Sequence, residues 1–125
     1  MIVLDASVLV AYLDDEHVHH ERAVGALDTD DDLALSTVTL AEVLVAPARL
    51  GQVDVVLQVL QDLQVDEVPL PEDAAVRLAH LRAETGVKLP DCCVLLATQP
   101  DSRMATLDRR LRLAAEGLGL EVVDV

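Results

Sequence analysis

Short apolar runs and longer runs with helical spacing follow one another along the chain. The first short run, Ile2-Val3-Leu4, is partly β-branched and is closed by Asp5. A run of this kind predicts a short strand that is buried on both faces of a sheet. Similar runs predict four more strands, at residues 33–35, 65–68, 103–107 and 120–123.

Between these runs, apolar residues recur at the spacing of a helix that buries one side. Ser36-Thr37 supplies an N-cap for a helix with Pro47 near its end, and Pro71 begins a helical segment that Gly86 stops. The predicted helices lie at residues 6–13, 17–27, 37–47, 51–63, 74–84, 90–98 and 108–116.

This alternation of strands and helices predicts an α/β fold, a three-layer α/β/α sandwich around a mainly parallel sheet. In such sheets, ligands bind outside the carboxyl ends of the strands, at the point where the strand order reverses. Asp5 and Asp108 each follow a predicted strand, so they become neighbours if those two strands pair. Asp91 begins the helix just before the later strand. Three carboxylates would then converge on one cleft.

The length of 125 residues suits a single domain spanning residues 1–125. Hydrophobic residues make up 52% of the chain, which excludes a disordered protein. Uncharged stretches such as residues 33–41 fall well short of the roughly 20 apolar residues that cross a bilayer. The start of the chain carries no basic residue before Asp5 and does not resemble a secretion signal. We therefore expect a cytoplasmic protein without a membrane partner.

The two cysteines, Cys92 and Cys93, are adjacent in the sequence. A disulfide between neighbouring residues is strained, and the pair lacks the spacing of a zinc or redox motif. We interpret both as reduced core residues, with reactive thiols as the alternative.

The formal net charge is −14, from 23 acidic and nine basic side chains. Net charge describes solubility and long-range steering, whereas nucleic acid is bound by a local patch. Four of the nine basic residues lie within ten residues of one another: Arg103, Arg109, Arg110 and Arg112. Three of them, Arg109, Arg110 and Arg112, are candidate contacts to nucleic-acid phosphates or, alternatively, only complement an acidic surface.

Glu42 is the one charged residue in the stretch 38–46. A buried carboxylate without a partner is costly, so we expect a compensating group beside it. Clustered carboxylates repel one another and favour a cation, and Mg²⁺ prefers oxygen ligands in octahedral geometry. Such a metal ion lowers the pKa of bound water and stabilises the oxygens of a phosphodiester displacement. Asp5, Glu42, Asp91 and Asp108 are the candidate ligands.

Four segments in order along the chain resemble the PIN domain family and, within it, the VapC-type toxins of bacterial toxin–antitoxin pairs. They are residues 3–9, 36–43, 89–98 and 105–108, the last followed by the arginines. No single segment is specific, but together they span nearly the whole chain.

The resemblance implies a parallel sheet between helices and magnesium or manganese held by acidic residues for endonucleolytic cleavage of RNA. By position, Asp5 and Asp91 match the main metal ligands, and Glu42 and Asp108 complete the acidic pocket. It also implies a homodimer and a small antitoxin whose tail presents an arginine to the acids. The expected function is that of a magnesium-dependent endoribonuclease toxin that cleaves structured RNA, such as tRNA or rRNA.

Ser7 and Thr106 match polar positions of the family, where they would orient water or carboxylates. His20 matches a recurrent histidine, to which we assign no chemistry. Tyr12 is the only aromatic residue, which disfavours base stacking and favours recognition of RNA by shape and backbone.

Other interpretations stay open at this point. Asp5, Asp91 and Asp108 could each cap a helix. A haloacid-dehalogenase-like phosphatase also begins with an apolar strand that ends in Asp, but it needs a second Asp where Ser7 stands. A non-catalytic module that binds RNA or a partner with the same fold is the third alternative.

Overall fold

The computed structural model describes residues 1–125, and its five parallel strands form one sheet in the order β3-β2-β1-β4-β5. The strands are β1 (Ile2–Leu4), β2 (Leu33–Ser36), β3 (Val65–Val68), β4 (Arg103–Ala105) and β5 (Glu121–Val122). The helices are α1 (Ala6–Leu13), α2 (His20–Leu27), α3 (Thr37–Arg49), α4 (Val53–Asp62), α5 (Ala74–Thr85), α6 (Leu89–Ala97) and α7 (Arg109–Gly117). The predicted α/β fold with a parallel sheet is confirmed.

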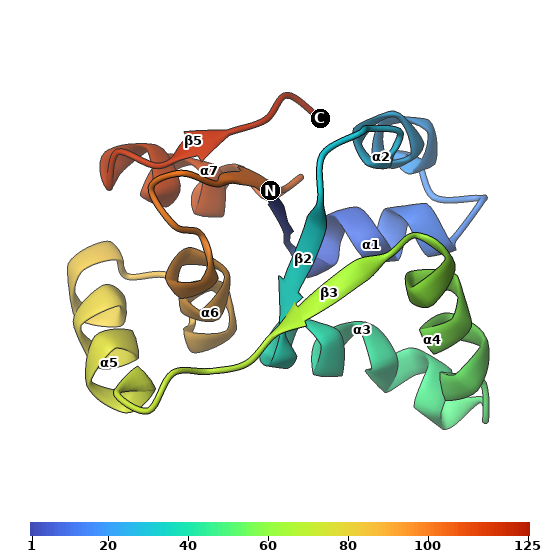
Figure 1. The fold of residues 1–125 in the computed structure, drawn as a ribbon, viewed down its shortest axis with the longest axis horizontal. Helices are drawn as coiled ribbons and strands as arrows, with labels where there is room; N and C mark the ends of the chain where they lie inside the picture. The colour runs from blue at the N-terminus through green and yellow to red at the C-terminus, as the bar shows by residue number, and fades with distance from the viewer.

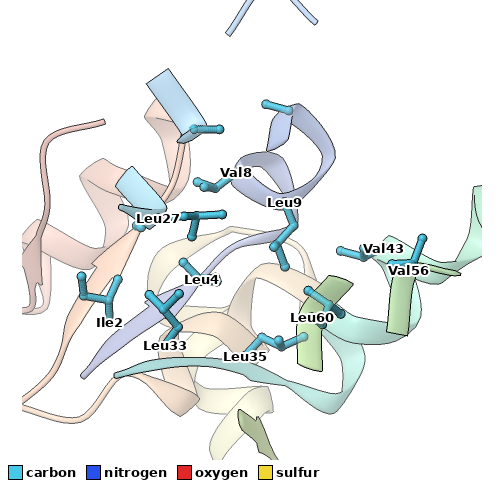
Figure 2. Close-up of a cluster of buried hydrophobic side chains, with 13 residues drawn as sticks. Ile2, Leu4, Val8, Leu9, Leu27, Leu33, Leu35, Val43, Val56 and Leu60 are labelled. Carbon is cyan, nitrogen blue, oxygen red and sulfur yellow. The ribbon is translucent and has the colours of Figure 1, made fainter. Parts of the chain in front are cut away.

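Helices cover both faces of the sheet, as Figure 1 shows. Side chains of α1, α2, α3 and α4 pack into one buried cluster, and side chains of α6 and α7, with part of α5, pack into the other. Within β1, Ile2 and Leu4 point into the first cluster, drawn in Figure 2, while Val3 points into the second. All three residues of β1 are therefore buried, which explains why this strand has no polar position.

The strand order reverses between β1 and β4, because β2 and β3 lie on one side of this pair and β5 on the other. Leu4 is in register with Ala105, and the backbone N–H of Asp5 donates to the carbonyl of Ala105 at 3.0 Å. The pairing on which the predicted meeting of Asp5 and Asp108 depends is therefore present. The carboxyl ends of these two strands form the position where such sheets bind ligands.

Four elements are shorter than predicted: α2, α4, β4 and β5. Helix α4 spans Val53–Asp62 against the predicted 51–63, and β5 spans Glu121–Val122 against the predicted 120–123. Helix α2 begins at His20 instead of residue 17, because the backbone N–H of His19 bonds to Nδ1 of His17 and the chain turns there. Strand β4 ends at Ala105 instead of residue 107, because the next residues leave the sheet for side-chain partners that are described below.

Cys92 and Cys93 are buried in α6 as free thiols, which agrees with their interpretation as core residues. Burial raises the pKa of both thiols. Each is therefore a poorer nucleophile at neutral pH than an exposed cysteine. Across the molecule, the helices are too short or too polar for any of them to span a bilayer.

Candidate functional site

Asp5 lies directly after β1 and is buried, with 5% of its surface exposed. It occupies the N-cap position of α1, but its side chain makes no capping hydrogen bond. Its Oδ2 instead accepts hydrogen bonds from the hydroxyls of Ser7 at 2.7 Å and Thr106 at 2.8 Å. The helix-capping interpretation of Asp5 is thus wrong, and the carboxylate is held by two groups from either side of the strand pair.

The two hydroxyls are themselves oriented by backbone groups. Leu107 donates its N–H to Ser7 Oγ, and Asp108 donates its N–H to Thr106 Oγ1, both at 3.0 Å. Each hydroxyl oxygen accepts one bond, so its single proton is directed at Asp5. This network draws residues 106–108 out of the sheet, which is why β4 is short.

Asp108 has a structural role that the sequence analysis left open. Its Oδ1 accepts hydrogen bonds from the N–H groups of Arg110 at 2.8 Å and Leu111 at 3.2 Å. Asp108 therefore caps α7. The cap uses only Oδ1, so Oδ2 is available for another partner.

A cleft of about 330 Å³ lies beside these residues. It is lined by Glu42, Val87, Lys88, Pro90, Asp91, Asp108 and Arg110. Asp91 reaches it from the first turn of α6 and does not occupy the N-cap position, which belongs to Lys88. Three of the four predicted acids thus share one cleft.

The expectation that Glu42 is buried is wrong. Glu42 is exposed, and α3 buries Thr39 and Val43 instead. The apolar residues around Glu42 do not all face the core: Val45, for example, is 47% exposed. The absence of charged residues around Glu42 therefore did not predict which side of α3 is buried against the rest of the protein.

The carboxylates lie close enough to repel one another. Although Glu42 is exposed, the protein around it displaces part of the water from its carboxyl, which raises its pKa, and the charges of Asp5 and Asp91 raise this pKa further. Burial likewise raises the pKa of Asp91, followed by the charges of Asp5 and Asp108, while Lys88 and Arg110 oppose the rise. The neighbouring carboxylates therefore disfavour ionisation of Glu42 and of Asp91.

This donor set fits a hard cation in its chemistry. Carboxylate oxygens are the preferred ligands of Mg²⁺, and a divalent charge would relieve the repulsion that raises the two pKa values. Glu42 and Asp91 take part in none of the ion pairs of the molecule, which are Arg77–Asp73, Arg103–Asp31 and Arg112–Glu116. The side chains are not drawn together, however: no group of three or more acids, histidines or cysteines is placed to hold a metal ion.

One of the three arginines expected to contact phosphate lines the cleft. Arg110 lines the cleft, whereas Arg109 and Arg112 do not. Arg112 donates to the carbonyl of Val123 at 3.0 Å and pairs with Glu116. A phosphate contact by Arg109 or Arg112 stays a prediction.

Lys88 also lines the cleft and was not predicted from the sequence. Its position three residues before Asp91 was the available signal, because this spacing brings side chains at a helix start close together. His20, in contrast, lies outside the cleft, with Nδ1 2.9 Å from the carbonyl of Ala11 and its ring beside Tyr12.

Comparisons with known proteins concern the family and the fold of the chain. The solved structures similar to the chain include FitAcB from Neisseria gonorrhoeae, with 25% identity, a TM-score of 0.73, and 99% of this chain and 97% of that chain covered. A toxin–antitoxin complex from Klebsiella pneumoniae shares 23% identity with a TM-score of 0.76, over 99% of this chain and 97% of that chain.

A third structure, VapBC2 from Rickettsia felis bound to a promoter DNA fragment, has 14% identity and a TM-score of 0.71, over 100% of this chain and 99% of that chain. Because the structures from Klebsiella pneumoniae and Rickettsia felis share less than 25% identity with the chain, their similarity shows the fold alone. No curated protein sequence matches the chain. The PIN domain family model matches residues 2–117, which include the sheet from β1 to β4 and all four acids. The chain belongs to the PIN domain family.

Proposed function

We propose that the protein is a metal-dependent endoribonuclease that acts as the toxin of a toxin–antitoxin pair. The observation that carries this proposal is that Glu42, Asp91 and Asp108 line one cleft, while Asp5, at the carboxyl end of β1, is oriented by two hydroxyls. PIN domains are generally nucleases, and the structural likeness to toxin–antitoxin complexes supports the biological role.

Asp5 and Asp91 would hold Mg²⁺ or Mn²⁺, and Glu42 and Asp108 would complete the acidic pocket. When bound, the metal supplies a water of lowered pKa and neutralises charge on the phosphodiester. Ser7 and Thr106 hold one oxygen of Asp5, so the carboxylate presents its other oxygen in a fixed direction.

The substrate would be a structured RNA such as tRNA or rRNA, recognised by its shape and backbone. The chain offers one aromatic side chain, Tyr12, which packs beside His20 and not in the cleft. Stacking of bases on aromatic rings is therefore disfavoured as the basis of recognition. The partner proteins would be a cognate antitoxin and a second copy of the chain in a homodimer.

Purified protein tests the proposal directly. With Mg²⁺ or Mn²⁺ it should cleave tRNA or rRNA, and chelation of the metal should stop cleavage. Asp5→Asn should abolish activity, since it removes the most constrained carboxylate. Asp66→Asn is the matched control, because Asp66 is exposed on β3 and lies outside the cleft. Cleavage by the Asp5→Asn variant at the wild-type rate would contradict the assignment.

A further inference from the structure

Positive side chains gather around one backbone carbonyl beside the acidic cleft. Arg82 of α5 donates from Nη1 to the carbonyl oxygen of Gly86 at 2.7 Å, and Arg110 of α7 donates from Nη2 to the same oxygen at 3.1 Å. Lys88 follows two residues later and lines the cleft with Arg110. Arg82, Lys88 and Arg110 are called the basic cluster below. They account for three of the nine basic residues of a strongly acidic chain.

The backbone at Gly86 creates this arrangement. Gly86 ends α5 in the left-handed conformation, with φ of +75°, which residues with a Cβ rarely adopt. A Cβ at this position would lie 3.9 Å from Nη2 of Arg110, so the guanidinium rests against the glycine. Val87 is buried directly after it, which fixes the chain as it enters α6.

No acid of the protein lies at ion-pair distance from the basic cluster. None of its members forms an ion pair: the ion pairs lie at Arg77–Asp73, Arg103–Asp31 and Arg112–Glu116. Two guanidinium groups that share one carbonyl oxygen repel each other, and an anion between them would turn this repulsion into attraction. Planar guanidinium groups match the geometry of a phosphate.

The carboxylates that line the cleft repel the negative charge of a phosphodiester substrate. Lys88 and Arg110 line the same cleft as Asp91 and form no ion pair with it, so both cations lie beside the acids and stay available to a substrate. The members of the basic cluster therefore lie where they could offset the repulsion between the acids and an incoming RNA strand.

We propose that Arg82, Lys88 and Arg110 bind a backbone phosphate of the RNA that flanks the one to be cleaved. The proposal rests on the proposed ribonuclease function and adds the residues that position its substrate. Lys88 and Arg110 line the cleft, and Arg82 shares the Gly86 carbonyl with Arg110, so the three cations lie beside the acids. Such contacts read the backbone and not the sequence.

Binding of a fluorescently labelled single-stranded RNA tests the proposal in the Asp5→Asn background, across a series of KCl concentrations. Arg82→Gln, Lys88→Gln and Arg110→Gln should each weaken binding about threefold to fivefold, as expected for one exposed ion pair. Each should also reduce the slope of log K against log salt by roughly 0.7, the value for one contact to a single strand. Arg49→Gln is the control: Arg49 is exposed on α3, makes no ion pair and changes the net charge equally.

Cleavage kinetics in the wild-type background give a second measurement. A positioning role predicts a raised KM with kcat nearly unchanged, in contrast to the loss of kcat in Asp5→Asn. If the cluster variants keep the affinity, salt slope and KM of the Arg49→Gln control while wild-type protein cleaves RNA, the basic cluster is not a phosphate site and the ribonuclease function stands. If wild-type protein neither binds nor cleaves RNA, the proposed function fails, and the phosphate site fails with it.

Discussion

At the scale of single residues, Asp5 is the most constrained of the four candidate acids. Two hydroxyl donors, each oriented by a backbone N–H, converge on one of its oxygens. No arginine or lysine is paired with it, so the charge of Asp5 is held in place without being neutralised. This combination is suited to binding a cation, because it orients a carboxylate and preserves its charge.

Removing one hydroxyl should disturb this orientation. We predict that Thr106→Val lowers kcat/KM for RNA cleavage on the order of tenfold to a hundredfold, the usual cost of losing a group that orients a metal ligand. The control is Thr37→Val, since Thr37 also donates to a carboxylate, that of Glu67 at 2.6 Å, away from the cleft. Equal activity losses in both variants would show that the Thr106 hydroxyl has no special role.

The raised pKa values of Glu42 and Asp91 predict a pH-dependent stability of the metal-free protein. A carboxyl whose pKa is higher when folded binds more protons in the folded state, so stability falls as pH rises through the range between the unfolded and folded pKa values. Above that range, Asp91→Asn should raise the Tm measured in chelator by a few degrees, because it removes a repelled charge.

Mg²⁺ should raise the Tm of the wild type more than that of Asp91→Asn, because only the wild type offers the full set of acids. Thermal unfolding with and without the metal measures both effects. A lower Tm for Asp91→Asn in chelator would contradict the repulsion inferred among these carboxylates.

At the scale of elements, helix starts and strand ends place the acids. Asp5 follows β1, Asp91 lies in the first turn of α6, and Asp108 caps α7. Asp108 thereby combines a structural bond with a position in the cleft, and these two contributions are separable by substitution.

Asp108→Asn keeps an acceptor for the N–H groups of α7, since asparagine is a good N-cap, whereas Asp108→Ala removes it. We predict that Asp108→Ala lowers the free energy of unfolding by about 1 kcal/mol and Asp108→Asn by much less. Both should lower the cleavage rate, because both remove the charge. Denaturant unfolding measures the loss of the cap, and RNA cleavage measures the loss of the charge. Full activity in Asp108→Asn would show that Asp108 caps α7 and has no role in cleavage.

The sequence was informative where a local pattern determines an element. Apolar runs located the strands, and the pairing of β1 with β4 brought Asp5 and Asp108 to one edge as expected. Two features could not be read in this way. Which side of α3 is exposed depends on the elements that pack against it, so the sequence did not reveal that Glu42 is exposed. Lys88 reaches the cleft after the turn at Gly86, and this turn could not be placed beside the acids from the sequence.

At the scale of the whole molecule, the net charge of −14 disfavours long-range attraction of RNA and favours a basic partner. If the proposed antitoxin presents basic groups to the cleft, its association rate should fall steeply as the salt concentration rises. Stopped-flow association at several ionic strengths measures this dependence. A rate that does not change with salt would contradict electrostatic recruitment by the acidic surface.

The most direct test of the central claim is to induce the chain in bacterial cells and map newly formed RNA 5′ ends, beside the Asp5→Asn variant. The carboxylate cleft predicts discrete new ends in a structured RNA and slowed growth with the wild type, and neither with Asp5→Asn expressed at the same level. The same new ends in both strains would contradict a ribonuclease site built around Asp5.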